Sequence, residues 1–224
     1  MSTEPSKAPR KVTKKRFLAF AHGHLNWDDF ENIRRSLGEQ TANKTKYLKS
    51  DRWLEVMWRQ AKQLDLHKRK SQRILDLGTG PGHFPYVCEA LGHEAWGLDR
   101  PGTAAYEALT KWMGVRVVPH KIRPRVPLPA LEGRFDLVTA FRIGFNSKGH
   151  DGNFVVFDIE DWAFFLDDIR DRILTPEGRL VLKMIRQDDY AGPKFGDAPL
   201  MEYFESRGAV IKPKGRVVWF DPLR

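Results

Sequence analysis

The sequence predicts an α/β fold in which seven strands form a doubly wound, mostly parallel sheet, with an antiparallel hairpin at its C-terminus and a helical extension at the N-terminus. Three observations predict it. The apolar run at 74–77 passes directly into a turn with glycine at positions 78, 80 and 82. From residue 73 onward, short apolar runs alternate with segments of helical periodicity, as helices covering a parallel sheet require. The last two runs flank a Pro-Lys-Gly turn, which is typical of a hairpin.

The length and composition favour a single catalytic domain. The chain has 224 residues, enough for one α/β domain with a full core and a small N-terminal addition. It contains no apolar stretch of the roughly eighteen residues that a membrane span needs, and its N-terminus lacks the apolar segment of a secretory signal. Its single cysteine, Cys88, cannot form an internal disulfide, which fits a reducing compartment. We therefore expect a cytoplasmic protein without membrane contact.

Residues 1–16 are predicted to form a disordered basic arm. They carry six lysines and arginines against Glu4, a balance of +5 within the formal charge of +9. Two prolines and the lack of apolar periodicity indicate disorder. The arm has two interpretations, a solubilising tail or a contact with nucleic acid or another polyanion.

Residues 17–69 are predicted to form a helical cap or lid. Asn26 caps a helix that runs to about residue 37, and Ser50 caps a second helix. Tyr47 is the large aromatic residue of the polar segment between them, and two roles stay open for it, closing over a bound ligand or packing. The second helix carries apolar residues at spacings of three and four, namely Trp53, Leu54, Met57, Trp58, Ala61 and Leu64.

Residues 70–224 are predicted to form the core. Strands are expected at about 73–77, 94–98, 115–119, 135–140, 179–185, 209–212 and 216–220. Helices are expected at about 83–91, 103–113, 161–173 and 199–206, the third of them capped by Asp161. A proline-rich loop at 122–131 crosses the sheet edge, and Pro176–Gly178 form a turn before the fifth strand.

The glycine turn at 78–82 predicts a cofactor crevice. Glycine has no Cβ to obstruct a ligand, so a strand that turns through glycines into a helix exposes backbone N–H groups. With Asp76 two residues before a G-x-G-x-G turn, residues 74–82 resemble the first motif of class I S-adenosylmethionine-dependent methyltransferases, a Rossmann-like family. A dinucleotide dehydrogenase would have G-x-G-x-x-G and a small residue at position 83, where this chain has His83. We do not identify a subfamily.

The resemblance implies S-adenosylmethionine as the cofactor. Asp76 suits its cationic amino-acid end, and Asp99, at the end of a strand, would accept from the ribose hydroxyls, with helix capping as the alternative. Where the family often has an acid near the adenine, this chain has His120 and Lys121, so adenine recognition falls to backbone groups or to His120. The predicted cofactor residues are Asp76, Gly78, Thr79, Gly80, Gly82, Asp99, Arg100, His120, Lys121 and Phe141.

Several positions bear on the methyl acceptor. Residues 140–146 lack the Asn/Asp-Pro-Pro-aromatic signature of adenine and glutamine N-methyltransferases, which disfavours methylation of a planar amide or exocyclic base nitrogen by that mechanism. By resemblance, Phe141 and Arg142 border the methionine end of the cofactor, with packing as the alternative. Lys183 is an unusual charge in an apolar strand, and it either reaches solvent at an edge or contacts a substrate.

His150 is the candidate catalytic base. It lies in the loop at 146–161, which leaves the carboxyl end of a strand, where ligands of open α/β sheets bind. Methyl transfer requires alignment and, for a protonated acceptor, removal of a proton. A loop histidine without a chemical role is the alternative. His22 and His24 with two nearby carboxylates do not complete a four-ligand set, so we predict no metal site.

The predicted function is S-adenosylmethionine-dependent transfer of a methyl group to an unidentified acceptor, with a small molecule as the first choice. The basic arm would instead serve an RNA methyltransferase, although the chain contains no recognised RNA module. A protein that binds or senses S-adenosylmethionine without turnover is the other alternative, because a fold does not dictate function. The residues carry no argument about the oligomeric state.

Overall fold

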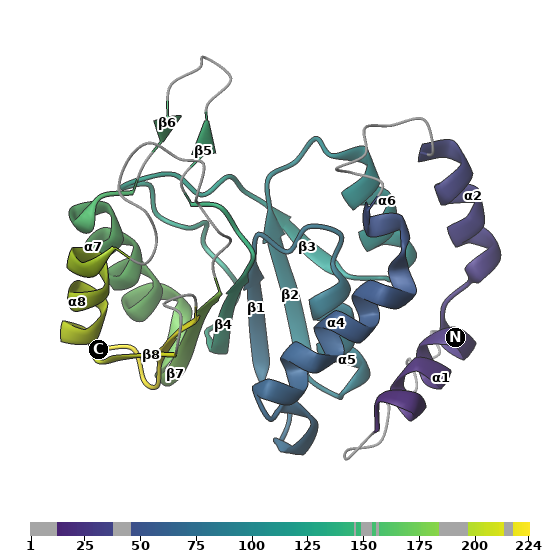
Figure 1. Cartoon of the computed structure of the whole chain (residues 1–224), viewed down its shortest axis with the longest axis horizontal. Coiled ribbons are helices and arrows are strands. Elements are labelled where there is room, and N and C mark those ends of the chain that lie inside the picture. The colour runs from purple at the N-terminus through teal and green to yellow at the C-terminus, as the bar shows by residue number, and fades with distance from the viewer. Residues whose placement is uncertain are drawn as a thin grey trace. The chain divides into compact units, whose positions relative to one another are not determined.

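The computed structural model describes residues 13–37, 46–145, 147–148, 154–155, 157–183, 197–212 and 217–224 (Figure 1). Seven strands form one sheet in the order β3-β2-β1-β4-β7-β9-β8, and a two-stranded ribbon pairs β5 with β6. β4 and β7 run parallel, whereas β9 runs antiparallel to both β7 and β8. The predicted α/β sheet with its C-terminal antiparallel pair is confirmed.

The elements have the following bounds. The strands of the sheet are β1 (Arg73–Leu77), β2 (Glu94–Asp99), β3 (Arg116–Pro119), β4 (Phe135–Phe141), β7 (Leu174–Lys183), β8 (Ala209–Ile211) and β9 (Val217–Phe220), and the ribbon consists of β5 (Ser147–Lys148) and β6 (Phe154–Val155). The helices are α1 (Lys14–His24), α2 (Trp27–Leu37), α4 (Ser50–Gln63), α5 (His83–Ala90), α6 (Ala104–Trp112), α7 (Ile159–Asp168) and α8 (Ala198–Ser206). Short helical turns are η1 (Lys46–Leu48), η2 (Leu66–Lys68) and η3 (Ile169–Ile173), the last of π type.

The chain divides into two compact units. The first contains Met1–Ile74, Thr79–Gly97 and Pro101–Val118, and the second contains Leu75–Gly78, Leu98–Arg100 and Pro119–Arg224. The N-terminal helices therefore share a unit with α5 and α6.

In the first unit, helix α4 packs on α5. Leu54, Trp58 and Ala61 are buried, as their helical spacing predicts. Ser50 does not cap the helix as predicted. It is the first helical residue, and its Oγ lies 3.2 Å from Nε2 of His83, with both side chains buried. The Ser50 hydroxyl therefore contacts His83, which is 33 residues away in the sequence, and does not cap the helix. No local sequence pattern reveals such a distant partner.

Helix α2 is capped by Asn26, as predicted. Its Oδ1 accepts from the backbone N–H groups of Asp28 and Asp29 at 3.1 and 3.3 Å. The Asn26 carbonyl also accepts from the indole Nε1 of Trp112 in α6, at 2.7 Å. The cap thus joins two helices of the first unit.

The basic arm ends earlier than predicted. Helix α1 begins at Lys14, and the Thr13 hydroxyl accepts from the backbone N–H of Arg16. Residues 14–16 were expected to be disordered, but the threonine cap and the burial of Phe17 and Ala21 make them part of a packed helix. The rest of the predicted arm, residues 1–12, lies outside the described residues.

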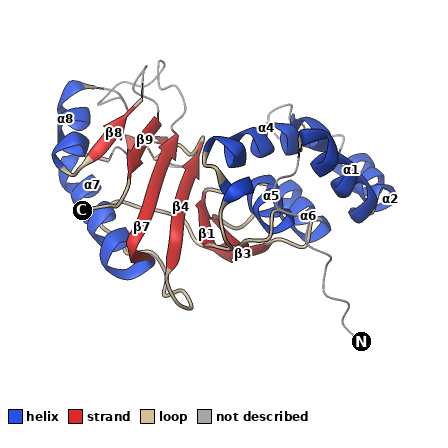
Figure 2. Cartoon of the chain, turned by 90° about the horizontal axis from the view of Figure 1, so that it is seen from below, coloured by secondary structure: helices blue, strands red, loops and turns tan. Residues whose placement is uncertain are grey.

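In the second unit, β4, β7, β9 and β8 lie side by side (Figure 2). Phe141 is opposite Lys183 at the carboxyl ends of β4 and β7. Strand β7 begins earlier than predicted, at Leu174, and a register shift in its pairing with β4 lies between Phe135 and Leu137. The predicted turn at Pro176–Gly178 falls within this irregular stretch and so does not end the strand.

Helix α7 is capped by Asp158, and the prediction of Asp161 was wrong by three positions. The Asp158 carboxylate accepts from the backbone N–H of Asp161 at 2.7 Å, and the Asp161 carboxylate accepts from that of Asp158 at 3.2 Å. This reciprocal capping box uses both acids, so the helix begins at Ile159. The aromatic residues around the start of α7 are buried together, namely Phe145, Phe157, Trp162 and Phe165.

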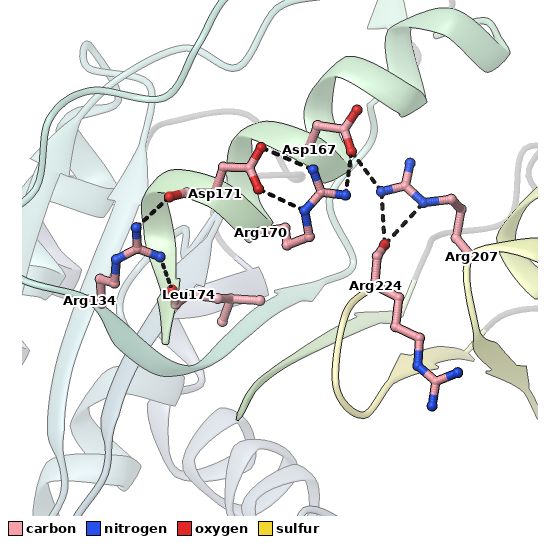
Figure 3. Close-up of polar contacts among 7 residues, drawn as sticks. All are labelled: Arg134, Asp167, Arg170, Asp171, Leu174, Arg207 and Arg224. Carbon is pink, nitrogen blue, oxygen red and sulfur yellow. Dashed lines mark hydrogen bonds and ion pairs between the residues drawn. The ribbon is translucent and has the colours of Figure 1, made fainter. Parts of the chain in front are cut away.

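An arginine network involves α7 and the turn η3 that follows it (Figure 3). Asp167 accepts from Arg207, which also donates to the backbone carbonyl of Arg224. Arg134 donates to the carbonyl of Leu174, at the start of β7. Within the second unit, Arg207 thus joins α7 to the end of α8 and to the C-terminal residue, and Arg134, which precedes β4, joins the start of β7.

Candidate functional site

The buried carboxylate of Asp76 is the first feature of the site. Asp76 is the fourth residue of β1 and is almost fully buried. The Thr139 hydroxyl, from the neighbouring strand β4, donates to its Oδ1 at 2.7 Å. Chain order in the sheet reverses between β1 and β4, which is where open α/β sheets bind ligands. A carboxylate held at this place can accept from a ligand that reaches the end of β1.

Gly78 must be glycine for two reasons. Its φ is +64°, a region that side chains with a Cβ rarely adopt. A Cβ there would also lie 2.7 Å from Cδ1 of Ile143, which follows β4. The Gly78 N–H donates to the Leu98 carbonyl at 2.7 Å. Within the second unit, the start of the turn is therefore held between β2 and the chain that leaves β4.

The rest of the turn belongs to the first unit. Gly80 and Gly82 have φ of +57° and +83°, and Gly82 directly precedes helix α5. A Cβ on Gly82 would lie 2.9 Å from Thr110, so packing requires glycine there. At Gly80 the nearest atom would be a ring carbon of Tyr106 at 3.8 Å, which is ordinary contact. Space beside the Gly80 backbone is therefore compatible with the close approach of a ligand.

Thr79 turns its side chain away from such a ligand. It is buried, and its methyl group packs so closely on the backbone of Gly97 that a Cβ there would lie 2.5 Å from it. Its hydroxyl has no hydrogen-bond partner among the described residues. A cofactor contact at Thr79 would therefore involve its backbone.

Asp99 ends β2 and is half-buried. Its Oδ1 accepts from the backbone N–H of Arg100 at 2.7 Å. Helix α6 begins at Ala104 with Thr103 as its N-cap residue, so Asp99 is not the cap that the alternative interpretation required. The Arg100 side chain is exposed.

His120 is placed next to Asp99 by the backbone. Its N–H donates to the Asp99 carbonyl at 2.8 Å. Burial, and secondarily the Arg123 guanidinium, hold the pKa of His120 below its usual value, so the ring is neutral at pH 7. Its Nε2 is buried without a hydrogen-bond partner among the described residues. The second unit thus brings Asp99 and His120 together, while Lys121 is exposed.

Phe141 is half-buried at the end of β4, at the same edge as the buried carboxylate of Asp76. The predicted base His150 and the loop residue Asn146 lie outside the described residues. Asp158 and Asp161, which share that loop, are used by the capping box and by ion pairs with Arg125. The prediction of a catalytic base therefore stays a prediction.

Tyr47 packs in the first unit. Its ring lies 4.9 Å from that of Trp53 and 5.5 Å from that of Tyr106, whose edge borders Gly80. Sequence reasoning missed Tyr106, Thr139 and Ile143. Thr139 had a signal, because it is a polar residue in an apolar strand, whereas Ile143 looks like any other apolar residue.

None of the helices among the described residues is long and apolar enough to cross a membrane. Among the same residues, no group of three or more His, Cys, Asp or Glu side chains could hold a metal ion. His22, from the cluster weighed above, forms an ion pair with Asp51 instead.

No protein-family model matches the chain, and no curated protein matches it. Solved structures of similar fold include a TehB-like S-adenosylmethionine-dependent methyltransferase from Corynebacterium glutamicum, at 20% identity and a TM-score of 0.48, with 80% of this chain and 96% of that chain covered. A ribosomal protein L11 methylase from Lactobacillus delbrueckii subsp. bulgaricus is 16% identical, with a TM-score of 0.46 and 74% of each chain covered. An S-adenosylmethionine-dependent methyltransferase from Aquifex aeolicus is 14% identical, with a TM-score of 0.44, and the match covers 71% of this chain and 86% of that chain.

These matches say only what the chain is similar to. Their identities are low and their TM-scores lie below 0.5. We therefore base the functional proposal on this chain's own residues.

Proposed function

We propose that the protein is an S-adenosylmethionine-dependent methyltransferase that acts on a small-molecule acceptor. The observation that carries this proposal is the carboxylate of Asp76, buried at the carboxyl end of β1 and followed directly by the glycine turn. A carboxylate in this place can accept hydrogen bonds from a cationic ligand and attract its charge. The ammonium group of a methionine-derived cofactor has the required charge.

The other site residues fit the same cofactor. Asp99 carries a carboxylate at the end of β2, and a carboxylate can accept hydrogen bonds from a pair of vicinal hydroxyls. The neutral ring of His120 can donate to or accept from a heterocycle. Gly80 allows a ligand to approach the backbone. Each group matches a different part of an adenosine linked to an amino acid.

The chain's contribution to the reaction is mainly orientation. When bound, S-adenosylmethionine supplies a methyl group on a sulfonium, an electrophile that reacts by displacement and needs alignment with the acceptor. Asp76 would hold the amino-acid end of the cofactor, and Asp99 would hold its ribose. Phe141, at the end of β4, would help to exclude water beside the reacting groups.

A dinucleotide cofactor fits this site less well. The fingerprint for dinucleotides needs a small residue at position 83 so that helix and strand pack closely. His83 is buried at the first position of α5, and its ring contacts Ser50. The position is therefore occupied by a large side chain with a partner of its own.

Calorimetric titration of S-adenosylhomocysteine into the purified protein tests the proposal. We expect one-to-one binding in about the micromolar range, no binding of NAD, and a loss of about tenfold or more in Asp99→Ala, which removes the acceptor of the ribose hydroxyls. Glu205→Ala, at an exposed position of α8, is the matched control and should bind as wild type does. Binding of NAD in place of S-adenosylhomocysteine, or equal binding by both variants, would contradict the proposal.

Turnover separates the remaining alternatives. Transfer of a labelled methyl group to the small-molecule fraction of an extract supports the proposal, and transfer to RNA supports the RNA alternative. Binding of S-adenosylhomocysteine without transfer to any fraction supports a sensing protein. Because helix α1 begins at Lys14, removal of residues 1–12 deletes three of the six basic residues of the arm and leaves this helix intact. RNA binding that is salt-sensitive and lost with this deletion would favour RNA as the acceptor.

A further inference from the structure

The positive charge of the chain is concentrated in the first unit. This unit contains 20 lysines and arginines against 11 aspartates and glutamates, a balance of +9. The second unit contains 18 of each kind, so the formal charge of +9 of the whole chain belongs to the first. An excess of charge that is confined to one part of a chain is typical of contact with a polyanion.

Helix α4 carries part of this charge on its outer side. Leu54, Trp58 and Ala61 are buried, so the opposite side of the helix faces outward. Arg52 and Arg59 are exposed there, two turns or about 10 Å apart along the helix axis. Among the described residues, neither guanidinium has a hydrogen-bond or ion-pair partner. Both charges are therefore available to a ligand.

Helix α1 brings further cations to the same region. The helix packs on α4, and Lys14 in its first turn forms an ion pair with Glu55 at 2.9 Å. Glu55 lies three residues after one of the two arginines and four before the other, so it adjoins both on the surface of α4. Lys15 and Arg16 follow Lys14 and are exposed, and their side chains have no partner in the part of the chain that the structure describes. Four cations form this basic face of the first unit, namely Lys15, Arg16, Arg52 and Arg59.

The surroundings of the basic face favour a nucleic acid over a lipid surface. The large hydrophobic residues that are exposed among the described residues all lie in the second unit, namely Val126, Ile159, Phe164 and Val210. A helix that binds a membrane surface inserts apolar side chains beside its cations, whereas α4 buries its apolar side. Arginine donates two parallel N–H groups to a phosphate, and a nucleic-acid duplex offers one negative charge per about 1.7 Å of its axis. Cations spread along α4 can therefore meet several phosphates of one duplex.

We propose that the basic face of α1 and α4 binds the phosphate backbone of a nucleic acid without reading its base sequence. Residues 1–12, which precede α1 in the chain, add Lys7, Arg10 and Lys11 to the same charge. The proposal places the main contact on folded helices and not in this N-terminal segment. It goes beyond methyl transfer and does not rest on it, because none of the four cations is among the predicted cofactor residues.

The test measures the fluorescence anisotropy of labelled RNA and DNA duplexes of about 20 base pairs as the full chain is added, between about 50 and 200 mM salt. We expect the wild type to bind with an affinity that falls as salt rises, with a slope of log K against log salt of about −0.9 for each phosphate neutralised. The double variant Arg52→Gln/Arg59→Gln should bind about tenfold or more weakly at the lower salt, with a slope reduced by about 2. Glutamine is a good helix former, so the variant should retain α4.

A second double variant controls for net charge. Lys111→Gln/Arg224→Gln also removes two positive charges at exposed positions, on α6 and at the C-terminus, and should bind the duplexes as the wild type does. Both double variants should bind S-adenosylhomocysteine within about twofold of the wild type. Removal of residues 1–12 should weaken duplex binding without abolishing it, because the basic face remains. Binding of either duplex with these properties supports the proposal.

Four results would overturn the proposal. The first is a wild type that binds neither duplex, and the second is an equal loss of binding in the two double variants, which assigns the effect to net charge. The third is full binding by Arg52→Gln/Arg59→Gln together with its loss on removal of residues 1–12, which assigns the contact to the N-terminal segment. The fourth is binding to vesicles of phosphatidylserine and phosphatidylcholine, lost in Arg52→Gln/Arg59→Gln, without binding to either duplex. In each case, binding of S-adenosylhomocysteine by the wild type shows separately whether the proposed function stands.

Discussion

Thr139 and Asp76 form the residue pair whose chemistry is most directly testable. Thr139→Val keeps the shape of the side chain and removes the hydroxyl that donates to the buried carboxylate at 2.7 Å. Loss of a donor to a buried charged group costs about 1–3 kcal/mol, so we expect a lower free energy of unfolding in urea and weaker binding of S-adenosylhomocysteine. Thr139→Ser retains the donor and should behave nearly as the wild type does. If the valine and serine variants are equally stable, the hydrogen bond does not support the carboxylate.

The site residues that could be predicted from the sequence belong to a local motif, whereas those that could not depend on contacts between residues far apart in the sequence. Asp76 and the three glycines were predictable because a motif of nine consecutive residues specifies them. Ile143 contacts Gly78 from 65 positions away, and no local pattern marks it. The hydrogen bond from the Arg142 backbone N–H to the Lys183 carbonyl depends in the same way on the register of β4 and β7, which only the folded sheet determines.

At the level of elements, the cap of helix α7 provides a test of local stability. Asp158→Ala removes the side-chain acceptor for the Asp161 N–H, and loss of such a cap costs about 0.5–2 kcal/mol. We expect a lower melting temperature in a thermal scan. Asp158→Asn keeps an acceptor oxygen and should retain most of the stability. The ion pair between Asp158 and Arg125, at 3.9 Å between exposed groups, contributes little.

An asparagine variant as unstable as the alanine variant would show that the charge, and not the cap, stabilises α7. Arg125 would then be the residue to vary next, because its guanidinium also contacts Glu160 and Asp161 in the first turn of the helix.

The type and order of the elements followed from periodicity, whereas their ends did not. Residues of helix α4 at spacings of three and four are buried as predicted. Its first turn was misassigned because the Ser50 hydroxyl bonds to His83 and not to its own helix. Strand β7 begins five residues early because an irregular stretch still pairs Leu174 with Phe135. Boundaries depend on tertiary partners, so they are the least predictable part of each element.

For the molecule as a whole, the buried histidine His83 makes stability depend on pH. Burial lowers its folded-state pKa from the usual 6.5 to about 3. Between these values the unfolded chain binds a proton that the folded protein does not bind. Stability therefore falls as the pH drops below 6.5 and continues to fall toward pH 3, by about 1 kcal/mol per pH unit. Above pH 6.5 the contribution of His83 to stability is fully present.

Urea unfolding of the wild type and of His83→Gln, each at pH 7 and pH 5, measures this contribution. We expect the wild type to lose about 2 kcal/mol more than the variant over that interval, because only the wild type can protonate position 83 on unfolding. Other titrating groups, such as His67 and His120, whose pKa values burial also lowers, act in both proteins and cancel in the difference. His24→Gln, at an exposed position of α1, should show the pH dependence of the wild type. An equal loss in the wild type and in His83→Gln would mean that the buried ring is not kept neutral by folding, and that the interface of Ser50 with α5 tolerates an imidazolium.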